Sequence, residues 1–227
     1  MWTLAIETAT LAGSAALLDD DRVVGQSLLD IALTHSERLM AMVDRLLEDC
    51  GRDIGDVDAL AVSIGPGSFT GLRVGVATVK GLAMALGLPV GPVPTLDALA
   101  SNLPFADAPV CPLLDARKGE VYLSLYRWDG EAMRRECEYL ALAPRAAAER
   151  LEPPVIVLGD GVTPCLPYLA HLGAGLRVAP SSHITPSAAV VGRLGRRAIA
   201  AGQGVAAESL EPLYLRPSEA ELKARCA

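Results

Sequence analysis

The chain has 227 residues and a formal net charge of −7, with 51% hydrophobic and 21% charged residues. This length suits one large or two small domains, and the composition is typical of a globular rather than a disordered chain. Nucleic acid phosphates require a basic face, and no run of lysine or arginine stands out. The sequence therefore argues against a chain that binds nucleic acid strongly by itself.

Signals for membrane insertion, export and metal binding are weak. No uncharged apolar run reaches about 18 residues without a glycine or proline, so we predict no membrane span. The start of the chain lacks a basic region and is typical of a strand, not of a signal peptide. The cysteines are odd in number, widely spaced and without a CxxC pair. This pattern predicts reduced thiols, a cytoplasmic location and no zinc site. The cysteines are Cys50, Cys111, Cys137, Cys165 and Cys226.

The first elements predicted are hairpin strands followed by a helix. Apolar runs at 4–10, 14–18 and from 23 onward are separated by short polar turns. Thr34 and Glu37 have the spacing of a capping box, which would begin a helix that ends near Gly51. One face of this helix is apolar, and two methionines widen it: Leu39, Val43, Leu46, Leu47 and Cys50, with Met40 and Met42.

A buried strand at 59–64 leads into a glycine-rich helix at 71–86. The Gly65-Pro66-Gly67 turn breaks the strand, and Ser68 or Thr70 can cap the helix. Its three interior glycines cost about 3 kcal/mol together relative to alanine, so a close neighbour must compensate. That neighbour is either this chain's own core or a partner's helix. The small residues form one stripe: Gly71, Gly75, Thr78, Gly81 and Ala85.

Two catalytic interpretations of this stretch fail on spacing. A phosphate-binding loop requires a lysine after its last glycine, but Leu72 follows Gly71. A serine nucleophile elbow requires glycine two residues before the serine, and Pro66 stands there before Ser68. A strand–turn–helix unit remains, and we expect Gly71 and Gly75 on its glycine face to meet a partner's helix.

The remaining chain repeats the plan of the first part. A short strand at 90–93 and a helix capped by Thr95 precede a proline-broken stretch, 102–109, which marks a lobe boundary. Strands at 110–115 and 121–126 then repeat the strand–carboxylate–turn–strand order, with Asp115 in the place of Glu7.

Later elements complete a second lobe. We predict a helix at 144–151, a buried strand at 155–158 that meets the Gly159-Asp160-Gly161 turn, and a helix from Thr185 or Ser187 to about 201. The predicted domains are an N-terminal α/β lobe, 1–105, carrying the partner-binding helices, and a C-terminal α/β lobe, 106–227, whose last segment could return to the first lobe.

The two units resemble the paired lobes of the actin/hexokinase/Hsp70-like (ribonuclease-H-like) ATPase architecture, an α/β fold. Five segments resemble the bacterial TsaB (YeaZ) family in order: LAIETAT at 4–10, GPGSFTGLRVGVATVKGLA at 65–83, DARKGEVY at 115–122, GDG at 159–161 and EPLYLR at 211–216. One departure is Glu7, where that family is expected to have aspartate.

This resemblance implies a non-catalytic partner subunit for TsaD, which transfers threonylcarbamoyl to adenosine of tRNAs reading ANN codons. Helices 35–50 and 71–86 would form the heterodimer, TsaE and tRNA would join the assembled complex, and the chain alone would form a homodimer. The partner-binding residues implied are Leu39, Met42, Val43, Gly71, Arg73, Gly75, Thr78, Lys80 and Leu82. For Arg73 and Lys80 the alternative is an ordinary solvated helix face.

The resemblance also implies where nucleotide would lie, with ATP or ADP as the candidate ligand in the complex and no resident cofactor otherwise. The candidate residues are Glu7, Thr8, Asp115, Arg117, Gly159, Asp160 and Gly161. Glu7 and Asp115 are interpreted as turn residues more readily than as catalytic carboxylates. Thr95 and Leu99 stand where TsaD has a pair of metal-binding histidines, so no metal site is expected. His35, His171 and His183 form no substitute.

A different class of function stays open at this point. The chain could be a nucleotide-hydrolysing enzyme or a glycoprotease-like metallopeptidase, as an older label for the wider family implies. The missing pair of histidines argues against peptidase chemistry. Measuring nucleotide turnover and bound metal on the isolated chain separates the two classes.

Overall fold

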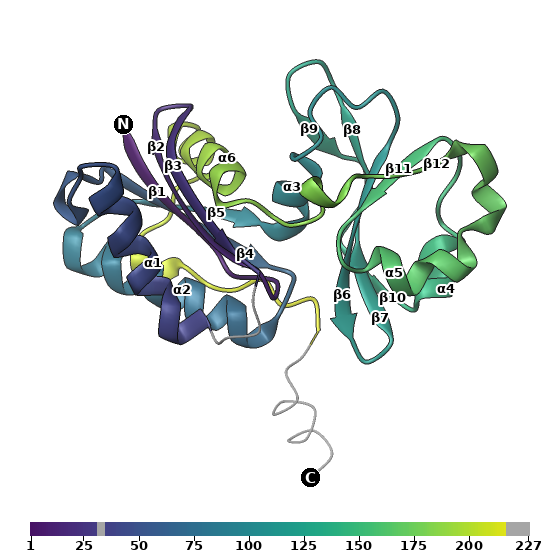
Figure 1. The fold of residues 1–227 in the computed structure, drawn as a ribbon, viewed down its shortest axis with the longest axis horizontal. Coiled ribbons are helices and arrows are strands. Elements are labelled where there is room, and N and C mark those ends of the chain that lie inside the picture. Colours follow the sequence, from purple (N-terminus) through teal and green to yellow (C-terminus); the bar gives the residue numbers. More distant parts are fainter. Residues whose placement is uncertain (31–34, 217–227) are drawn as a thin grey trace, which may run out of the picture.

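The computed structural model describes residues 1–30 and 35–216, and they form two α/β lobes with a helix between them (Figure 1). The first lobe contains a five-stranded sheet in the order β3-β2-β1-β4-β5. β2 pairs antiparallel with both β1 and β3, whereas β4 and β5 run parallel to β1. The strands are β1 (Trp2–Glu7), β2 (Gly13–Asp19), β3 (Arg22–Leu29), β4 (Ala59–Gly65) and β5 (Val90–Pro94).

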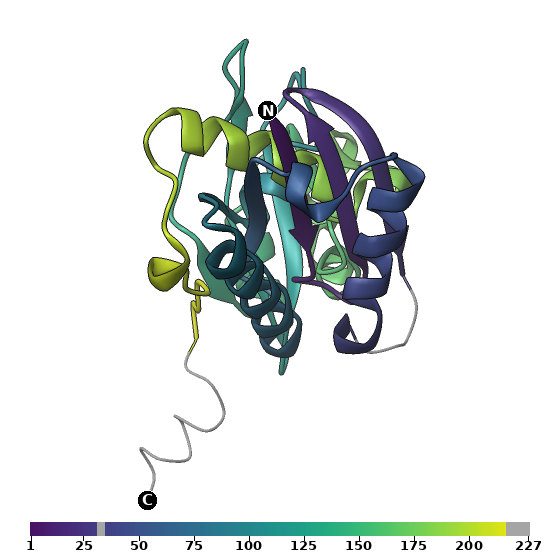
Figure 2. The same cartoon turned by 90° about the vertical axis from the view of Figure 1, so that its left-hand side faces the viewer.

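Helices cover both faces of this sheet (Figure 2). α1 (His35–Asp49) and α2 (Phe69–Leu86) lie side by side on one face, and α6 (Ala188–Ala200) packs on the other. α3 (Thr95–Ala100) contacts β4 and β5 of the first lobe and β6 of the second, so it joins the lobes. Small side chains from the sheet meet α6, while larger aliphatic ones meet α1 and α2.

The second lobe repeats the strand order of the first, as β10-β7-β6-β11-β12. Each pair of neighbours has the same relative direction as its counterpart in the first lobe. The strands are β6 (Val110–Arg117), β7 (Glu120–Leu123), β10 (Leu140–Leu142), β11 (Val155–Leu158) and β12 (Leu176–Val178). The prediction of two related lobes in one α/β architecture is confirmed.

Smaller elements complete the second lobe. A hairpin of β8 (Tyr126–Trp128) and β9 (Met133–Arg135) is inserted after β7 and pairs with β6. Two short helices, α4 (Pro144–Ala148) and α5 (Val162–Cys165), pack against each other. The five 3₁₀ turns are Ile54–Asp56, Leu166–Tyr168, Ala170–Gly175, Ser181–His183 and Ala207–Ser209 among the described residues.

The C-terminal segment lies on the first lobe. After α6, Val205 forms a β-bridge with Val90, and the backbone N–H of Leu213 donates to the carbonyl of Ile64 at 2.7 Å. Lys80 Nζ donates to the carbonyls of Glu208 and Leu210. This segment therefore runs along α2 toward the second lobe, which positions it beside the candidate site.

The two ends of α2 are capped by residues that the sequence predicts, whereas the predicted cap of α3, Thr95, is wrong. Ser68 is the N-cap of α2 and accepts from the backbone N–H of Gly71, and Gly87 ends the helix with φ 68°. Thr95 does not cap α3, because Pro94 occupies that position and the buried Thr95 hydroxyl has no partner among the described residues. The predicted Thr34–Glu37 capping box lies outside the described residues.

Among the described helices, α2 alone is long and apolar enough to cross a membrane by length and composition. A helix from a protein core passes the same test. Leu72, Val76 and Val79 of α2 are buried against the sheet, and its other side carries Arg73 and Lys80. Packing of this buried side within the first lobe accounts for part of the helix's apolarity.

Candidate functional site

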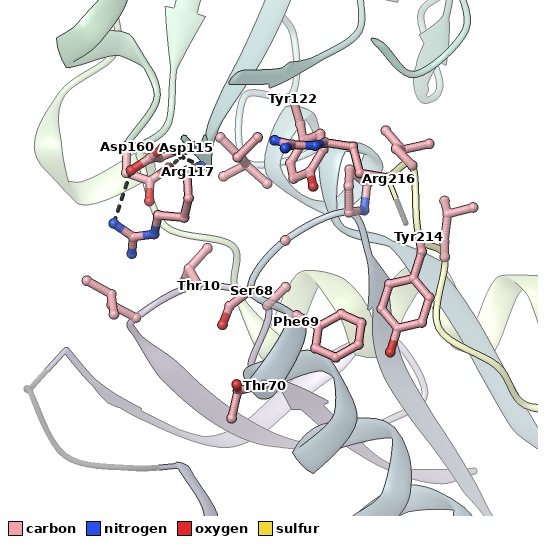
Figure 3. Close-up of a pocket in the computed structure, with 18 of the residues that line it drawn as sticks. Thr10, Ser68, Phe69, Thr70, Asp115, Arg117, Tyr122, Asp160, Tyr214 and Arg216 are labelled. Carbon is pink, nitrogen blue, oxygen red and sulfur yellow. Dashed lines mark hydrogen bonds and ion pairs between the residues drawn. The ribbon is translucent and has the colours of Figure 1, made fainter. Parts of the chain in front are cut away.

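A pocket of about 430 Å³ lies between the two lobes (Figure 3). Four segments build most of it: the β1–β2 loop, the start of α2, the β6–β7 turn and the C-terminal segment at 213–216. Tyr122 of β7 and Asp160, in the turn after β11, complete the lining. Parts of both lobes therefore meet at one concave site, which is the usual location of a small-molecule site in a two-lobed α/β protein. The polar and aromatic side chains that line it are Thr10, Ser68, Phe69, Thr70, Arg73, Asp115, Arg117, Lys118, Tyr122, Asp160, Tyr214 and Arg216.

Glu7, at the end of β1, does not reach this pocket. Its side chain is fully buried, with Oε1 accepting from the Ala9 N–H at 2.6 Å and from the Ser63 hydroxyl at 3.1 Å. Oε2 has no partner among the described residues. Burial raises the pKa of Glu7 to about 8, against the opposing effect of the two hydrogen bonds. Glu7 is therefore mostly protonated near neutral pH and is a poor metal ligand.

Thr8 holds the glycine face of α2 against the sheet. Its hydroxyl donates to the Gly71 carbonyl at 2.8 Å, and a Cβ at Gly75 would collide with the same hydroxyl. Both glycines are buried. The expectation that Gly71 and Gly75 meet a partner's helix is corrected here, because Thr8, just after this chain's own β1, bonds to Gly71 and fills the space above Gly75.

Asp115 occupies the corresponding place in the second lobe and has a different environment. Its Oδ1 accepts from the Arg117 backbone N–H at 2.7 Å, and its Oδ2 pairs with Arg117 Nη1 at 3.1 Å. The Asp115 backbone N–H in turn donates to Asp160 Oδ1 at 2.9 Å. Figure 3 shows these three side chains together at one wall of the pocket. Desolvation raises the pKa of Asp160.

The Gly159-Asp160-Gly161 turn is packed against β6 backbone. Gly159 has φ 105°, and a Cβ there would collide with the Leu113 carbonyl. The Gly161 N–H donates to that same carbonyl at 3.0 Å. Neither glycine lines the pocket, so of this turn only Asp160 reaches it.

The C-terminal segment closes one side of the pocket. The rings of Tyr214 and Phe69 lie 4.8 Å apart between centroids, and Arg73 Nε donates to the Tyr214 hydroxyl at 3.3 Å. Arg216 pairs with Glu120 of β7 at 2.6 Å and so connects this segment to the second lobe. Burial raises the pKa of Tyr122 at the pocket wall, and Arg216 opposes that shift.

The predicted partner-binding residues fall into two groups. Leu39 and Val43 are buried in the core beneath α1, as Gly71 and Gly75 are beneath α2, so none of these four forms a surface. The partly or fully exposed members are Met42, Arg73, Thr78, Lys80 and Leu82, of which Lys80 is held by the C-terminal segment.

Sequence reasoning missed the outward face of α2. Ala77, Gly81 and Met84 are exposed, and Met84 retains 63% of its accessible surface. It also assigned no role to Tyr214 and Arg216, although the 211–216 segment was one of the resembling blocks. For Ala77, Gly81 and Met84 the sequence did hold a signal. They are separated by four and three positions, and such a spacing places side chains on one helix face.

The site was tested against the metal–phosphate chemistry that this architecture implies. Metal–phosphate sites of that kind use paired acidic turns, but Glu7 is buried and protonated, and Asp115 is engaged by Arg117. No group of three histidine, cysteine or acidic side chains converges within residues 1–30 and 35–216. The residues present do not fit a bound divalent metal, although the cationic side chains of the pocket suit an anion.

Comparison with known proteins identifies relatives over the full length. A family model described as "TsaD: tRNA N6-adenosine threonylcarbamoyltransferase" matches residues 30–154. The chain is 32% identical to the tRNA threonylcarbamoyladenosine biosynthesis protein TsaB of Bacillus subtilis, over 98% of this chain and 97% of that protein. It is 35% identical to the TsaB protein of Escherichia coli, over 95% of each.

Solved structures agree with these relatives. YeaZ from Pseudomonas aeruginosa matches with a TM-score of 0.82 at 33% identity, over 94% of this chain and 99% of that chain. A ROK hexokinase from Thermus thermophilus matches with a TM-score of 0.51 at 11% identity, over 89% of this chain and 100% of that one, which shows the fold alone. Together with the two-lobed fold, these relatives show that the chain belongs to the TsaB (YeaZ) family of tRNA threonylcarbamoyladenosine biosynthesis proteins.

Proposed function

We propose that this chain is a non-catalytic subunit that binds TsaD and supports threonylcarbamoyl transfer to tRNAs reading ANN codons. TsaE and tRNA would join the same assembly in the cytoplasm, and ATP or ADP would act there. The observation that carries this proposal is the outward face of α2, where the small residues Ala77 and Gly81 are exposed together with Met84.

Small residues on an exposed helix allow another helix to approach closely. Apart from the adjoining turns of its own helix, no described atom lies within 4 Å of a Cβ built at Gly81, so this position is exposed. Two helices packed through such residues pass at the short end of the roughly 8–10 Å range of interaxial distances. An exposed glycine also costs about 1 kcal/mol of helix stability relative to alanine, which a buried contact with a partner would offset.

The relationship to the transferase supports the choice of partner. The family model for the transferase spans residues 30–154, which include α1 and α2. A partner of that family would carry a related pair of helices. Two related helix pairs can meet face to face about a pseudo-twofold axis, in the manner of an isologous interface. The same reasoning predicts that two copies of this chain pair when TsaD is absent.

Gly81→Leu tests this proposal. We expect the variant to fold and to melt at or slightly above the wild-type temperature, because leucine is a better helix former at an exposed position. Binding to purified TsaD, measured by calorimetry, should weaken roughly 5- to 150-fold, since overpacking typically costs about 1–3 kcal/mol. Ala200→Leu is the matched control, because Ala200 is exposed on α6 across the sheet.

Gly75→Leu is a second comparison variant, because it changes an inward-facing glycine of the same helix. Gly75 faces Thr8 within the same lobe, so this variant should lose stability rather than partner binding alone. If Gly81→Leu binds TsaD as tightly as wild type, the outward face of α2 is not the docking surface. An isolated chain that hydrolyses nucleotide at a steady rate would instead support the enzymatic alternative.

A further inference from the structure

The chain crosses between the two lobes twice, and the two crossings are bonded to each other. It leaves the first lobe through α3 and residues 101–109, and it returns through residues 179–187, which lead into α6 (Figure 1). Nδ2 of Asn102 donates to the carbonyl oxygens of His183 and Thr185, each at 2.9 Å. A side-chain amide has two N–H donors, so Asn102 uses both of them here. Any bending of the lobes that slides one crossing past the other would break these bonds.

The outward crossing is anchored in the cores of both lobes, because α3 is buried on two sides. Leu96 and Leu99 are fully buried in a cluster with residues of β6 and β11 in the second lobe. Ala98 is equally buried in the cluster that β1, β4 and α6 form in the first lobe. A helix that is close-packed on both sides resists rotation relative to either neighbour. α3 is therefore a packed connection between the lobes and not a loose linker.

A carboxylate on α3 ties this helix to the second lobe through two tyrosines. Tyr126 and Tyr139 both donate their hydroxyl hydrogens to Oδ1 of Asp97, at 2.5 and 2.8 Å. Burial raises the pKa of both tyrosines, and the neighbouring Asp97 adds to the shift, so both hydroxyls remain donors near neutral pH. The Arg135 guanidinium lies over the Tyr139 ring at 4.0 Å from the centroid and helps to hold that ring. These contacts fix α3 against the β8–β9 side of the second lobe.

The C-terminal segment also links the lobes, but by a contact of a different kind. Arg216 pairs with Glu120 at 2.6 Å, and both side chains are partly exposed. Water and dissolved ions screen such a pair, so its contribution should decrease as the salt concentration rises. The bonds of Asn102 and Asp97 involve a neutral amide, neutral hydroxyls and backbone carbonyls, and none of them is an ion pair. Salt therefore distinguishes the two kinds of link.

We propose that α3 and its hydrogen bonds form a locked joint, which holds the two lobes at one angle and keeps the pocket between them at a fixed width. Proteins that close around a ligand do so through a few connecting residues that change their backbone angles. Here the connecting residues are buried or hydrogen-bonded to each other. A ligand or partner therefore meets a preformed surface, and its binding does not require the lobes to close. The joint stands independently of the docking face proposed on α2. Its polar members are Asp97, Asn102, Tyr126 and Tyr139.

Pulsed electron paramagnetic resonance on the full chain tests this proposal, because it measures the distribution of distances between two spin labels. One label is attached through a non-natural amino acid at Ala200 on α6 and the other at Ala170 in the second lobe, both of which are exposed. We expect one narrow distribution, unchanged when salt rises from about 0.1 M to about 1 M. A broad or divided distribution at either salt concentration overturns the proposal.

Two variants loosen the joint from different sides. Asn102→Ala should broaden or divide the distribution, because the two crossings lose their mutual hydrogen bonds. Asp97→Ala should do the same by releasing both tyrosines, whereas Asp97→Asn keeps an accepting oxygen and should stay narrow. Asp107→Asn is the matched control, since Asp107 lies in the same crossing and forms an exposed ion pair with Arg177.

Val157→Ala separates a loosened joint from a general loss of stability. Val157 is fully buried in a core cluster of the second lobe that includes none of the described residues of α3. Its truncation should lower the melting temperature and leave the distance distribution as in the wild type. Narrow distributions in both Asn102→Ala and Asp97→Ala, or equal broadening in Asp107→Asn or Val157→Ala, contradict the locked joint.

Discussion

The two lobes end their first strands with carboxylates that have opposite environments. Glu7, the last residue of β1, is fully buried, with one oxygen unpartnered among the described residues. Asp115 lies at the pocket wall and pairs with Arg117. The strand order and directions around the two residues are the same. A repeated fold therefore preserves the position of an acidic residue without preserving its chemistry.

This difference bears on whether the two lobes can hold a metal-bound phosphate between them. A metal–phosphate site needs an ionised carboxylate on each side of the cleft, and here one side is protonated near neutral pH because burial raises the pKa of Glu7 to about 8. The other side is neutralised by a neighbouring guanidinium. The two lobes do share one feature near these carboxylates. A glycine turn packs tightly against backbone in each lobe, at Gly67 in the first and at Gly159 in the second.

The largest loss of stability is expected when a glycine in one of these two turns is replaced. Gly159→Ala combines a φ of 105° with a collision against the Leu113 carbonyl, and Gly67→Ala in the first lobe collides with the Ala9 carbonyl. We expect Gly67→Ala to lower the free energy of unfolding by about 1–3 kcal/mol through overpacking alone. Gly159→Ala should lower it by about 4 kcal/mol, because backbone strain adds to overpacking there. Thermal melting should show a decrease of roughly 10 °C for a chain of this length.

Gly119→Ala is the control for this prediction. Gly119 has φ 76°, but beyond its two chain neighbours a Cβ there would meet none of the described atoms within 4 Å. It should therefore cost only about 1–2 kcal/mol, the price of the left-handed conformation. If Gly159→Ala costs no more than Gly119→Ala, close packing against β6 does not hold the turn. If only one of the two lobes is sensitive, the turns are not equivalent.

Much of the architecture was predictable because it depends on local pattern. The alternation of apolar strands with glycine turns predicted both lobes, and the residues Ser68 and Gly87 mark the ends of α2 in the sequence itself. The Gly159 turn was predicted next to a buried strand, and it is found there. These features follow from backbone conformation and capping, which a short stretch of sequence determines.

The site was less predictable because it depends on contacts between distant segments. Thr8 and Gly75 are far apart in sequence, so nothing local showed that one fills the space above the other. The same holds for Tyr214, which reaches Phe69 and Arg73 only because the C-terminal segment returns along α2. Amphipathic pattern shows that a helix has two faces, but long-range packing decides which small residues stay exposed.

An intermediate effect is expected from removing the ionisable group in the first lobe. The folded-state pKa of Glu7, about 8, lies above its ordinary value of 4.5. The folded state therefore holds a proton that the unfolded state releases between these values, and wild-type stability should fall by a few kcal/mol as pH rises through that window. Above about pH 8 the loss is complete and the dependence on Glu7 ends.

Glu7→Gln should remove this slope. The variant is expected to be less stable than wild type in acid, because a buried amide has two donors where the protonated acid has one. The difference should narrow as pH rises toward about 8. Urea unfolding of both proteins at several pH values measures it. Parallel curves for the two proteins would show that Glu7 is ionised in the folded state at neutral pH.

The smallest effect is expected from the carboxylate of the second lobe. Asp115→Asn removes the charge that pairs with Arg117, but an asparagine oxygen can still accept from the Arg117 backbone N–H. The Arg117 side chain is 62% exposed, so water and salt screen the pair, and such pairs are worth about 0–1 kcal/mol. A double-mutant cycle with Arg117→Gln should give a coupling energy in that range, decreasing when salt rises from about 0.1 M to about 1 M. A coupling of several kcal/mol that persists in high salt would mean that Asp115 is buried and structural like Glu7, and the contrast between the two lobes would disappear.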